Sequence, residues 1–469
     1  MHKPVSKVRE AKLELYRKKG KIHAKAISGR FNRLRWMMVW FTQIIFYGAC
    51  WLTWESNGLS RQAILFDIAH EKLYLFDLVL WPQDALLLAF VLILAATALF
   101  FVTAMAGRLF CGFTCPQTIY TMIFSWVEAK VEGNHLARLK LDQSPLRGKT
   151  LWLKASKHGL WLLIAGWTAI SFVGYFTPIR ELLPTVFSLD TGPWEAFWLI
   201  FYAAFTYVQA GLAREAVCQH MCPYSRFQGV MFDPTTANVS YDYQRGEPRS
   251  LGRESSQNDQ IAKTGDCIDC GICVQVCPTG IDIRDGLQLA CINCGLCIDA
   301  CDQVMEKIGA PSGLIRFASE QELAGQPKPQ GCLQRPRVMV YGALLLFFSC
   351  FAVFTVSQRS LLLVDVLRDR GALLRETAEG RIENAYTLNL MNLDATTHDY
   401  ELSVSGLPGL EIVGQQAFSA APGSIQPLTI TVSAPHNGEH SGIHAIRFKL
   451  VAKHDPAIRT EEKSSFILP

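Results

Sequence analysis

The sequence reads CIDCGICVQVCP at residues 267–278 and CINCGLCIDAC at residues 291–301, and these two stretches decide the fold of the domain around them. Each has the spacing C-x2-C-x2-C-x3-C, which is typical of bacterial two-cluster ferredoxins. In that arrangement three thiolates of one stretch hold one cluster, and the fourth cysteine reaches the other cluster. The sequence therefore predicts two 4Fe-4S clusters, one held by Cys267, Cys270, Cys273 and Cys301, the other by Cys291, Cys294, Cys297 and Cys277.

The residues between these cysteines agree with the prediction. Gly271 and Gly295 allow tight turns, and their N–H groups can be offered to cluster sulfide. A structural zinc site needs cysteine pairs separated by a longer spacer, and it leaves the third cysteine of each stretch unexplained. Pro278 follows the first stretch whereas Asp302 follows the second. We expect this departure to change the local turn without removing a ligand.

The composition indicates a membrane protein. The 469 residues are 50% hydrophobic and 18% charged, which is too apolar for an ordinary soluble protein. Eight of the 15 cysteines fall within residues 267–301, and such bunching indicates metal binding and not disulfides. The first apolar stretch begins only after a basic segment of some 35 residues, and no small-residue cleavage site follows it, so we expect no secretory signal peptide.

Five apolar runs are long enough to cross a bilayer, which needs about 20 residues. They are residues 34–54, 82–106, 159–176, 194–212 and 338–356. The first 35 residues carry 12 Lys and Arg, and residues 107–158 carry eight, whereas residues 55–81 carry two and residues 177–193 carry one. Because basic loops stay in the cytoplasm, we expect the N-terminus and residues 213–337 to be cytoplasmic, and the chain beyond residue 357 to be periplasmic.

Two further cysteine pairs follow the second and fourth apolar runs, as CGFTCP at residues 111–116 and CQHMCP at residues 218–223. An i, i+4 spacing places both sulfurs on one face of a helix, and the proline tends to end or kink that helix. If the two hairpins pack together, four thiols meet at the cytoplasmic membrane face. Soft ligands of this kind suit Cu(I), zinc or a further iron-sulfur centre; the alternative is that these cysteines are packing residues. The predicted site is Cys111, Cys115, Cys218 and Cys222, with His220 and Met221 as additional copper-compatible groups.

The remaining cysteines and a group of histidines carry less information. Cys50 and Cys350 lie within apolar runs and Cys332 just before the last one, where packing is the expected role. His436, His440 and His444 share parity on a possible strand, so an external metal patch is one interpretation and ordinary surface histidines the other.

The C-terminal tail alternates apolar and polar residues at residues 386–391, 400–404, 428–432 and 443–451. A period of two indicates half-buried strands. Gly and Pro separate about six or seven such strands over some hundred residues, which predicts an immunoglobulin-like sandwich. The tail contains no cysteine and no catalytic constellation, so we expect a docking role.

Together, the basic head, CGFTCPQ, CQHMCPYSRFQ, the doubled ferredoxin motif, the last apolar run and the sandwich tail resemble the FixG/RdxA/CcoG family of cytochrome oxidase accessory proteins. The resemblance covers nearly the whole chain. It implies an inner-membrane assembly factor for a cbb-type oxidase that reduces Cu(II) to Cu(I), working with oxidase subunits or a copper-exporting P-type ATPase. It also implies that the eight ferredoxin cysteines hold the clusters and that Cys111, Cys115, Cys218 and Cys222 face copper.

Our hypothesis is that a cytosolic donor reduces the clusters, which then reduce Cu(II) near the membrane dithiols, so that the protein is a cupric reductase. The alternative is an electron-transfer subunit of a quinone-linked respiratory reductase, which also carries such hairpins. A third possibility, a regulatory sensor, finds no kinase or DNA-binding module to support it, and we expect no nucleic-acid partner.

The expected fold is a polytopic α-helical membrane protein with five spans, a cytoplasmic ferredoxin-like α+β insert and a C-terminal all-β domain. The predicted segments are a basic tail (1–33), a first hairpin (34–106), a CxxxCP segment with a basic loop (107–158), a second hairpin (159–212), a second CxxxCP segment (213–240), the ferredoxin domain (241–336), a fifth helix (337–357) and the sandwich (358–469).

Overall fold

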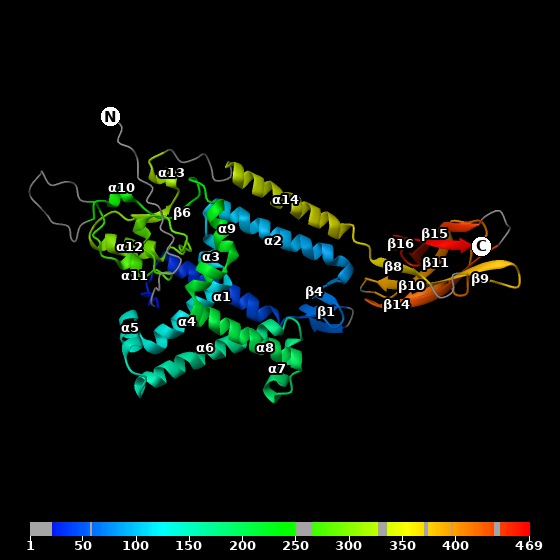
Figure 1. The fold of residues 1–469 in the computed structure, drawn as a ribbon, viewed down its shortest axis with the longest axis horizontal. Helices are drawn as coiled ribbons and strands as arrows, with labels where there is room; N and C mark the ends of the chain where they lie inside the picture. The colour runs from blue at the N-terminus through cyan, green and yellow to red at the C-terminus, as the bar shows by residue number, and fades with distance from the viewer. Residues whose placement is uncertain are drawn as a thin grey trace, which may run out of the picture. The chain divides into compact units, whose positions relative to one another are not determined.

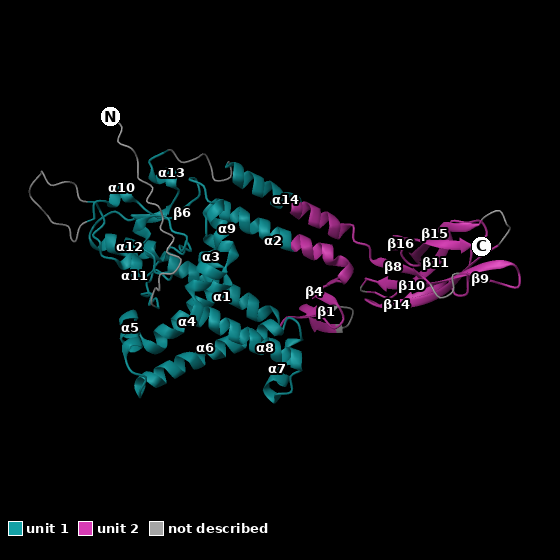
Figure 2. Ribbon diagram, viewed as in Figure 1, with its two compact units in different colours: residues 1–50, 92–347 teal, residues 51–91, 348–469 magenta. Residues whose placement is uncertain are grey.

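The computed structural model divides the chain into two compact units, which Figure 2 colours separately. Unit 1 comprises Met1–Cys50 and Leu92–Phe347, and unit 2 comprises Trp51–Val91 and Phe348–Pro469. The structure describes residues 21–56, 59–249, 265–326, 335–369, 374–394, 396–435 and 441–469. Of the three boundaries between the units, one follows Cys50 and the other two fall within two long apolar helices, α2 (Ala85–Ala106) and α14 (Pro336–Ser357).

Helices make up most of unit 1, and they follow the order shown in Figure 1. Besides α2 and α14, they are α1 (Arg30–Ala49), α3 (Leu109–Phe113), α4 (Pro116–Glu132), α5 (His135–Gln143), α6 (Lys149–Val173), α7 (Ile179–Ser188), α8 (Pro193–Thr206), the π-helices η2 (Tyr207–Ala213) and η3 (Val217–Met221), and α9 (Pro223–Met231). Aromatic packing joins them: the buried rings of Phe124 in α4 and Trp161 in α6 stack with centroids 5.2 Å apart.

Three helices within the described residues are long and apolar enough to cross a membrane: Pro82–Ala106, Pro193–Ala213 and Pro336–Ser357. Few of their side chains are buried, which agrees with an apolar surrounding, so the chain is a membrane protein. The apolar runs at residues 34–54 and 159–176 lie in α1 and α6, which are less apolar. Moreover, α1 ends at Ala49 and the chain enters a strand at Thr53, so the expected helix over 34–54 is too long at its C-terminal end.

The start of the described chain is packed against the rest of unit 1. Residues 1–20, most of the basic head, lie outside the described residues. From Lys21 onward the segment is held in place: the Lys25 N–H donates to the Gln275 carbonyl at 2.8 Å. Asp299 accepts from the N–H groups of Phe31 and Asn32 at the start of α1, at 3.1 and 2.8 Å. Residues 21–33 are therefore not a free tail, because their backbone groups have partners in the ferredoxin region.

The ferredoxin region contains short elements around two similar halves. They are β6 (Asn238–Tyr241) paired with β7 (Ile315–Ala318), α10 (Tyr243–Gly246), α11 (Ile272–Gln275), η4 (Ile283–Asp285), α12 (Leu296–Lys307) and α13 (Glu320–Leu323). Gly271 and Gly295 precede α11 and α12 with φ of 65° and 73°, the left-handed conformation that glycine adopts without cost. The tight turns expected at these two glycines are present.

In unit 2, residues 51–91 form short strands that were not predicted from the sequence. They are β1 (Thr53–Ser56), β2 (Leu59–Gln62), β3 (Ile64–Asp67), β4 (Lys72–Leu75) and β5 (Leu78–Leu80), followed by η1 (Pro82–Asp84). This stretch contacts the C-terminal domain, since Lys72 Nζ donates to the Gly423 carbonyl at 3.0 Å and Arg359 pairs with Asp84 at 2.6 Å.

The C-terminal domain is all-β, with two sheets that share one buried core. One sheet has the order β12-β14-β10-β8, with β9 beside β10, and the other has the order β13-β11-β15-β16. The strands are β8 (Leu362–Arg368), β9 (Arg375–Glu376), β10 (Arg381–Asn392), β11 (His398–Ser405), β12 (Glu411–Val413), β13 (Ala417–Ala420), β14 (Ile425–Pro435), β15 (Gly442–Ala452) and β16 (Arg459–Leu468). The four runs expected to be strands lie within β10, β11, β14 and β15, and their alternation matches the alternating burial of each strand.

Candidate iron-sulfur and dithiol sites

The first predicted set of cluster ligands surrounds one small cavity, which we call the cluster 1 site. Its lining includes Cys267, Cys270, Cys273 and Cys301, with Tyr241 and Arg284 nearby. Cys267 and Cys273 are buried, whereas Cys270 is exposed. The loop before α11 and the first turns of α12 thus bring together four thiols that are up to 34 residues apart in the chain (301 − 267).

The second predicted set surrounds a neighbouring cavity, the cluster 2 site, lined by Cys277, Cys291, Cys294 and Cys297. Cys273 lines this cavity as well as the first, so the two sites are adjacent. No three described Cys, His, Asp or Glu residues could hold a single metal ion. Thiols spread around a cavity suit a cubic cluster with a ligand at each iron better than one ion, so the residues fit 4Fe-4S groups.

Burial dominates the acid-base properties of these thiols. Desolvation raises the pKa of Cys273 to about 11 and that of Cys291 to about 12. Burial, together with Cys273 and Asp302, also raises the pKa of Cys301 to about 12. Thiolates at these positions therefore need the positive charge of iron, and cluster insertion displaces protons.

The first CxxxCP pair spans a break between two helices. Cys111 lies in α3, which ends at Phe113, and Cys115 has extended backbone (φ −60°, ψ 127°) immediately before α4. Pro116 is the first residue of α4, where a missing N–H costs nothing and the fixed φ favours a helix start. The expectation that both sulfurs lie on one continuous helix is therefore wrong, because the proline begins a new helix instead of ending the old one.

The second pair repeats this arrangement. Cys218 lies in the π-helix η3, and Cys222 has extended backbone (φ −78°, ψ 112°) before Pro223, the first residue of α9. Upstream, Arg214 ends η2 with φ 43°, a conformation that residues other than glycine rarely adopt. Gln117 holds this break, because its Nε2 donates to the carbonyls of Gln209 and Arg214 at 2.9 and 3.0 Å.

The four CxxxCP thiols lie close enough to interact electrostatically across the two pairs. Burial raises the pKa of Cys111 to about 12, with smaller contributions from Cys115 and Cys218. Burial, followed by Cys115 and Cys222, raises the pKa of Cys218 to about 11. No three Cys, His, Asp or Glu residues in the described part of the chain are arranged around one ion, so the two pairs lie near each other without forming a closed metal site.

The additional groups named from the sequence are differently placed. His220 and Met221 are both exposed, Met221 by 64%. Cys50 is buried and donates to the Tyr47 carbonyl, as expected of a packing residue, whereas Cys350 is exposed. Cys332, His436 and His440 lie outside the described residues, so the proposed histidine patch stays a prediction for which only His444 is placed, in β15.

The first CxxxCP segment lies directly against the loop of the cluster 2 site. A Cβ added at Gly112 would meet the Ile292 carbonyl oxygen at 2.7 Å and that of Asn293 at 3.0 Å. The buried Arg108 donates to the carbonyls of Leu289, Cys291 (3.3 Å) and Ser225 (2.5 Å). One guanidinium therefore joins the cluster 2 loop to both CxxxCP segments, and a glycine allows their backbones to touch.

A cluster of buried charged side chains lies next to the second CxxxCP pair, and the sequence did not predict it. Glu128 in α4 is fully buried, and its carboxylate contacts Lys21 at 2.7 Å, Arg214 at 2.9 Å, Arg138 at 3.4 Å and Lys157 at 3.7 Å. Burial by itself raises the pKa of this carboxyl, but Arg214 and Lys21 outweigh it and lower the pKa to about 2. The charged Glu128 thus holds Arg214 four residues before Cys218.

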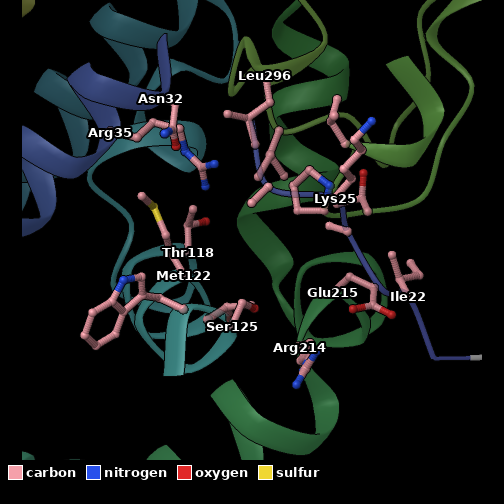
Figure 3. Close-up of a pocket in the computed structure, with 18 of the residues that line it drawn as sticks. Ile22, Lys25, Asn32, Arg35, Thr118, Met122, Ser125, Arg214, Glu215 and Leu296 are labelled. Carbon is pink, nitrogen blue, oxygen red and sulfur yellow. The ribbon is translucent and has the colours of Figure 1, made fainter. Parts of the chain in front are cut away.

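A cavity of about 210 Å³ lies between these elements within unit 1 (Figure 3). Segment 22–27, α1, α4, residues 214–218 and the cluster 2 loop all contribute to its wall. Figure 3 shows Arg35 and Asn32 on one side of the space, Lys25 and Glu215 on another, and Met122 and Ser125 below. The cavity also has aromatic walls, Trp36 and Trp126, whose rings pack edge to face at 6.2 Å.

Family models match three parts of the chain. A 4Fe-4S dicluster domain matches residues 213–320, a 4Fe-4S binding domain matches residues 88–133, and an IG-like fold at the C-terminus of FixG matches residues 352–469. The first two matches include the CxxxCP pairs as well as the ferredoxin cysteines.

Several curated relatives match over most of the chain. Nitrogen fixation protein FixG of Rhizobium meliloti is 32% identical over 461 residues, covering 90% of this chain and 88% of the relative. Protein RdxB of Cereibacter sphaeroides is 38% identical over 398 residues, covering 83% of each. Among solved structures, a FixG-related protein from Vibrio parahaemolyticus is 29% identical over 23% of this chain and 97% of that chain, with a TM-score of 0.21.

Proposed function

Because the chain belongs to the FixG/RdxA family, we propose that this membrane-bound iron-sulfur electron-transfer protein reduces Cu(II) to Cu(I) during the maturation of a cbb-type cytochrome oxidase. Iron-sulfur electron transfer follows from the family and from the matching 4Fe-4S domains. The copper and oxidase parts of the proposal come from the resemblance and from the chemistry of the paired thiols.

The observation that carries the proposal is the contact between the cluster 2 loop and the first CxxxCP segment. Electrons move efficiently only over short distances, and here the Gly112 Cα lies against the backbone of Ile292 and Asn293. Cys111 packs against the same group of residues, which includes Cys294 and Leu296. Soft thiols that favour Cu(I) thus lie beside the place where an electron is held.

Each cysteine has a proposed role in this scheme. Cys267, Cys270, Cys273 and Cys301 hold one 4Fe-4S cluster and Cys277, Cys291, Cys294 and Cys297 the other, and the two cavities they line support this pairing. Bound clusters supply single electrons at adjacent positions. Cys111, Cys115, Cys218 and Cys222 receive copper as substrate, and the exposed His220 and Met221 are weaker copper candidates.

The proposed topology has five spans, with α1 and α6 added to the three strongly apolar helices. The N-terminus and the clusters face the cytoplasm of a bacterial inner membrane, and an immunoglobulin-like domain beyond residue 357 faces the periplasm. The composition of unit 2 supports this, because residues 55–81 and the chain beyond residue 357, both expected outside, belong to that one compact unit. We also propose the eight segments predicted from the sequence, from the basic tail (1–33) to the sandwich (358–469), as the domain organisation of the chain.

The proposed partners follow from this placement. A cytosolic electron donor reaches the ferredoxin region, and a copper-exporting P-type ATPase or the oxidase subunits receive Cu(I). The C-terminal domain offers a docking surface on the opposite side of the membrane.

The test replaces all four CxxxCP cysteines by serine in the full-length, cluster-loaded protein. We expect both clusters to be retained, as judged by iron content and electron paramagnetic resonance, while Cu(II) reduction falls at least tenfold. The matched control, Cys350→Ser, changes an exposed thiol elsewhere and is expected to reduce Cu(II) at the parent's rate. Undiminished copper reduction in the four-serine variant would eliminate these thiols as the copper site.

A second candidate function, electron transfer with a quinone, is favoured by the cavity of Figure 3. Its volume suits a ring-sized molecule, and it borders both Cys218 and the cluster 2 loop. Arg138 lines it, and the buried Nε of this arginine has no hydrogen-bond partner among the described residues. A quinone carbonyl could accept such a hydrogen bond. This function predicts cluster reoxidation by a soluble quinone analogue and indifference to copper.

A further inference from the structure

The two cluster loops have the same backbone conformation but opposite exposure. Asp269 and Asn293, at equivalent positions, both adopt left-handed φ, of 51° and 54°, and each is followed two residues later by a left-handed glycine. Residues 269 and 270 of the first loop are exposed, whereas residues 291–296 of the second loop are all buried. The difference arises from what packs on each loop, because the loops themselves are alike.

Membrane-side residues cover the second loop. Gly112 touches its backbone, and Arg108 donates to its carbonyls at Leu289 and Cys291. Arg35 of α1, only 5% exposed, donates from Nε to the Gly112 carbonyl at 3.1 Å. The ring of Phe31 closes over Gly295, where an added Cβ would meet it at 2.6 Å. The cluster 2 site thus faces the CxxxCP thiols, and the cluster 1 site faces solvent at Cys270.

The two sites also differ in charge: in the described part of the chain, the arginines at the cluster 2 loop lack carboxylate partners, whereas the arginine at the cluster 1 site has them. Two buried arginines, Arg35 and Arg108, lie at the cluster 2 loop, and neither is in an ion pair within the described residues. At the cluster 1 site the nearby Arg284 is paired with both Asp269 and Asp282. Uncompensated positive charge favours the more negative, reduced form of a cluster and so raises its reduction potential.

We propose that electrons enter this protein at the cluster 1 site, pass to the cluster 2 site and leave across the Gly112 contact towards the CxxxCP thiols, with Arg35 and Arg108 as positioning residues. The inference rests on the proposed function for its acceptor. A soluble one-electron donor of the ferredoxin or flavodoxin class is oxidised at the exposed Cys270 loop, and each Cu(II) is reduced to Cu(I) by one electron. No bond or proton needs to move in either transfer.

The first test reads the potentials without copper. In an anaerobic redox titration followed by electron paramagnetic resonance, the parent protein is expected to show two unequal midpoint potentials. Cys270→Ser, at the cluster 1 site, should shift the lower potential. Arg35→Gln should lower the higher potential by about 59 mV, which corresponds to tenfold in the equilibrium constant for one electron. A shift of the same potential by both variants, or a higher potential at the Cys270 cluster, would overturn the inference.

The second test measures transfer across the contact. Gly112→Ala places a methyl group against two backbone carbonyls and is expected to slow Cu(II)-driven cluster reoxidation at least tenfold, while reduction by dithionite and cluster content stay at parental values. Gly159→Ala is the control, since nothing lies within 4 Å of an added Cβ there. Reoxidation of Gly112→Ala at the parent's rate, although hydrogen exchange shows that the loop contact is broken, would contradict the proposed exit. If copper does not reoxidise the clusters of the parent protein, the proposed function is refuted. The order of the two cluster potentials is tested separately, because the redox titration contains no copper.

Discussion

At the residue scale, Glu128 shows how one buried carboxylate organises a membrane-face site. It lies among Lys21, Arg138, Lys157 and Arg214, and these cations come from segments that are far apart in the sequence. Arg214 has a strained φ and stands four residues before Cys218, and its guanidinium pairs with Glu128 while Gln117 holds its carbonyl. The thiols of the second CxxxCP pair are therefore positioned by a residue that carries no copper chemistry itself.

Glu128→Ala is expected to destabilise unit 1 severely. The substitution leaves Arg138 and Arg214, 4% and 8% exposed, without their shared counter-charge, whereas Lys157 keeps its closer partner Glu132 at 2.8 Å. Breaking a buried ion pair from one side costs about 3–5 kcal/mol. Thermal unfolding of the detergent-solubilised protein, compared with Glu195→Ala at the start of α8, measures the effect. Equal melting temperatures for the two variants would show that the ion pairs of Glu128 do not stabilise unit 1.

The same carboxyl predicts a pH dependence. Arg214 and Lys21 overcome the effect of burial and lower the pKa of Glu128 to about 2 from its usual 4.5. A carboxyl whose pKa is depressed on folding stabilises the protein above its unfolded pKa, and this stabilisation is lost as the pH falls towards the folded value. The difference in free energy of unfolding between the parent and Glu128→Gln should therefore be constant above about pH 5 and shrink between about pH 4.5 and pH 2. A difference that grows on acidification would be contrary to this assignment.

At the element scale, α11 and α12 begin with equivalent sequences, but different residues pack around their first turns. Both begin after a left-handed glycine, but nothing lies within 4 Å of a Cβ at Gly271, whereas one at Gly295 would meet the Phe31 ring at 2.6–3.0 Å. The cluster 2 half is thus locked to the N-terminal segment, and the cluster 1 half is free of such contacts at this position.

This asymmetry predicts unequal effects of the same substitution. Gly271→Ala is expected to cost about 1 kcal/mol, the usual price of a left-handed alanine. Gly295→Ala should cost more and displace Phe31, because the clash adds to the backbone strain. Iron and sulfide content and melting temperature of the two purified variants measure this. Equal losses in both variants would mean that Phe31 does not press on the second loop.

The sequence predicted the elements whose chemistry is local. Ligand spacing anticipated both groups of thiols around the two cavities, and period-two alternation located β10, β11, β14 and β15. It did not anticipate the helix break at each CxxxCP pair, because an i, i+4 spacing before proline is compatible with one helix or with two. Short strands such as β1 to β5 were missed because runs of three or four residues give too little periodicity to detect.

Interactions between distant segments could not be predicted. Glu128 in the sequence is an ordinary charged residue of an amphipathic stretch, and nothing near it indicates that Lys21 and Arg214 reach it. The same holds for Arg108 and Gly112, whose partners lie about 180 residues further along the chain. Only the folded chain shows that the first CxxxCP segment meets the second cluster loop instead of the first.

At the scale of the whole molecule, the two units divide the chain by function. Unit 1 contains every cysteine named as a cluster or copper ligand, and unit 2 contains the all-β domain together with the strands of residues 51–91. Residues 51–91 and 348–469 are separated by more than 250 residues of sequence and yet belong to one unit. The proposed topology accounts for this unit, because it puts residues 55–81 and the chain beyond residue 357 on the same side of the membrane.

The proposed orientation predicts which engineered thiols can be labelled from outside. Ser441→Cys, exposed next to β15, should react with a membrane-impermeant maleimide in spheroplasts, and Lys140→Cys, exposed in α5, should react only after the membrane is broken. Labelling above the parent's background, read by gel shift, measures both. Reaction of Lys140→Cys in intact spheroplasts would reverse the topology.

The most direct measurement of the central claim is anaerobic mixing of chemically reduced, cluster-loaded protein with Cu(II). Cluster reoxidation is followed by electron paramagnetic resonance while a chelator traps Cu(I). The account predicts one Cu(I) formed per electron lost from the clusters. Clusters that stay reduced in the presence of copper, and are reoxidised instead by a soluble quinone analogue, would contradict it and establish the quinone-linked function.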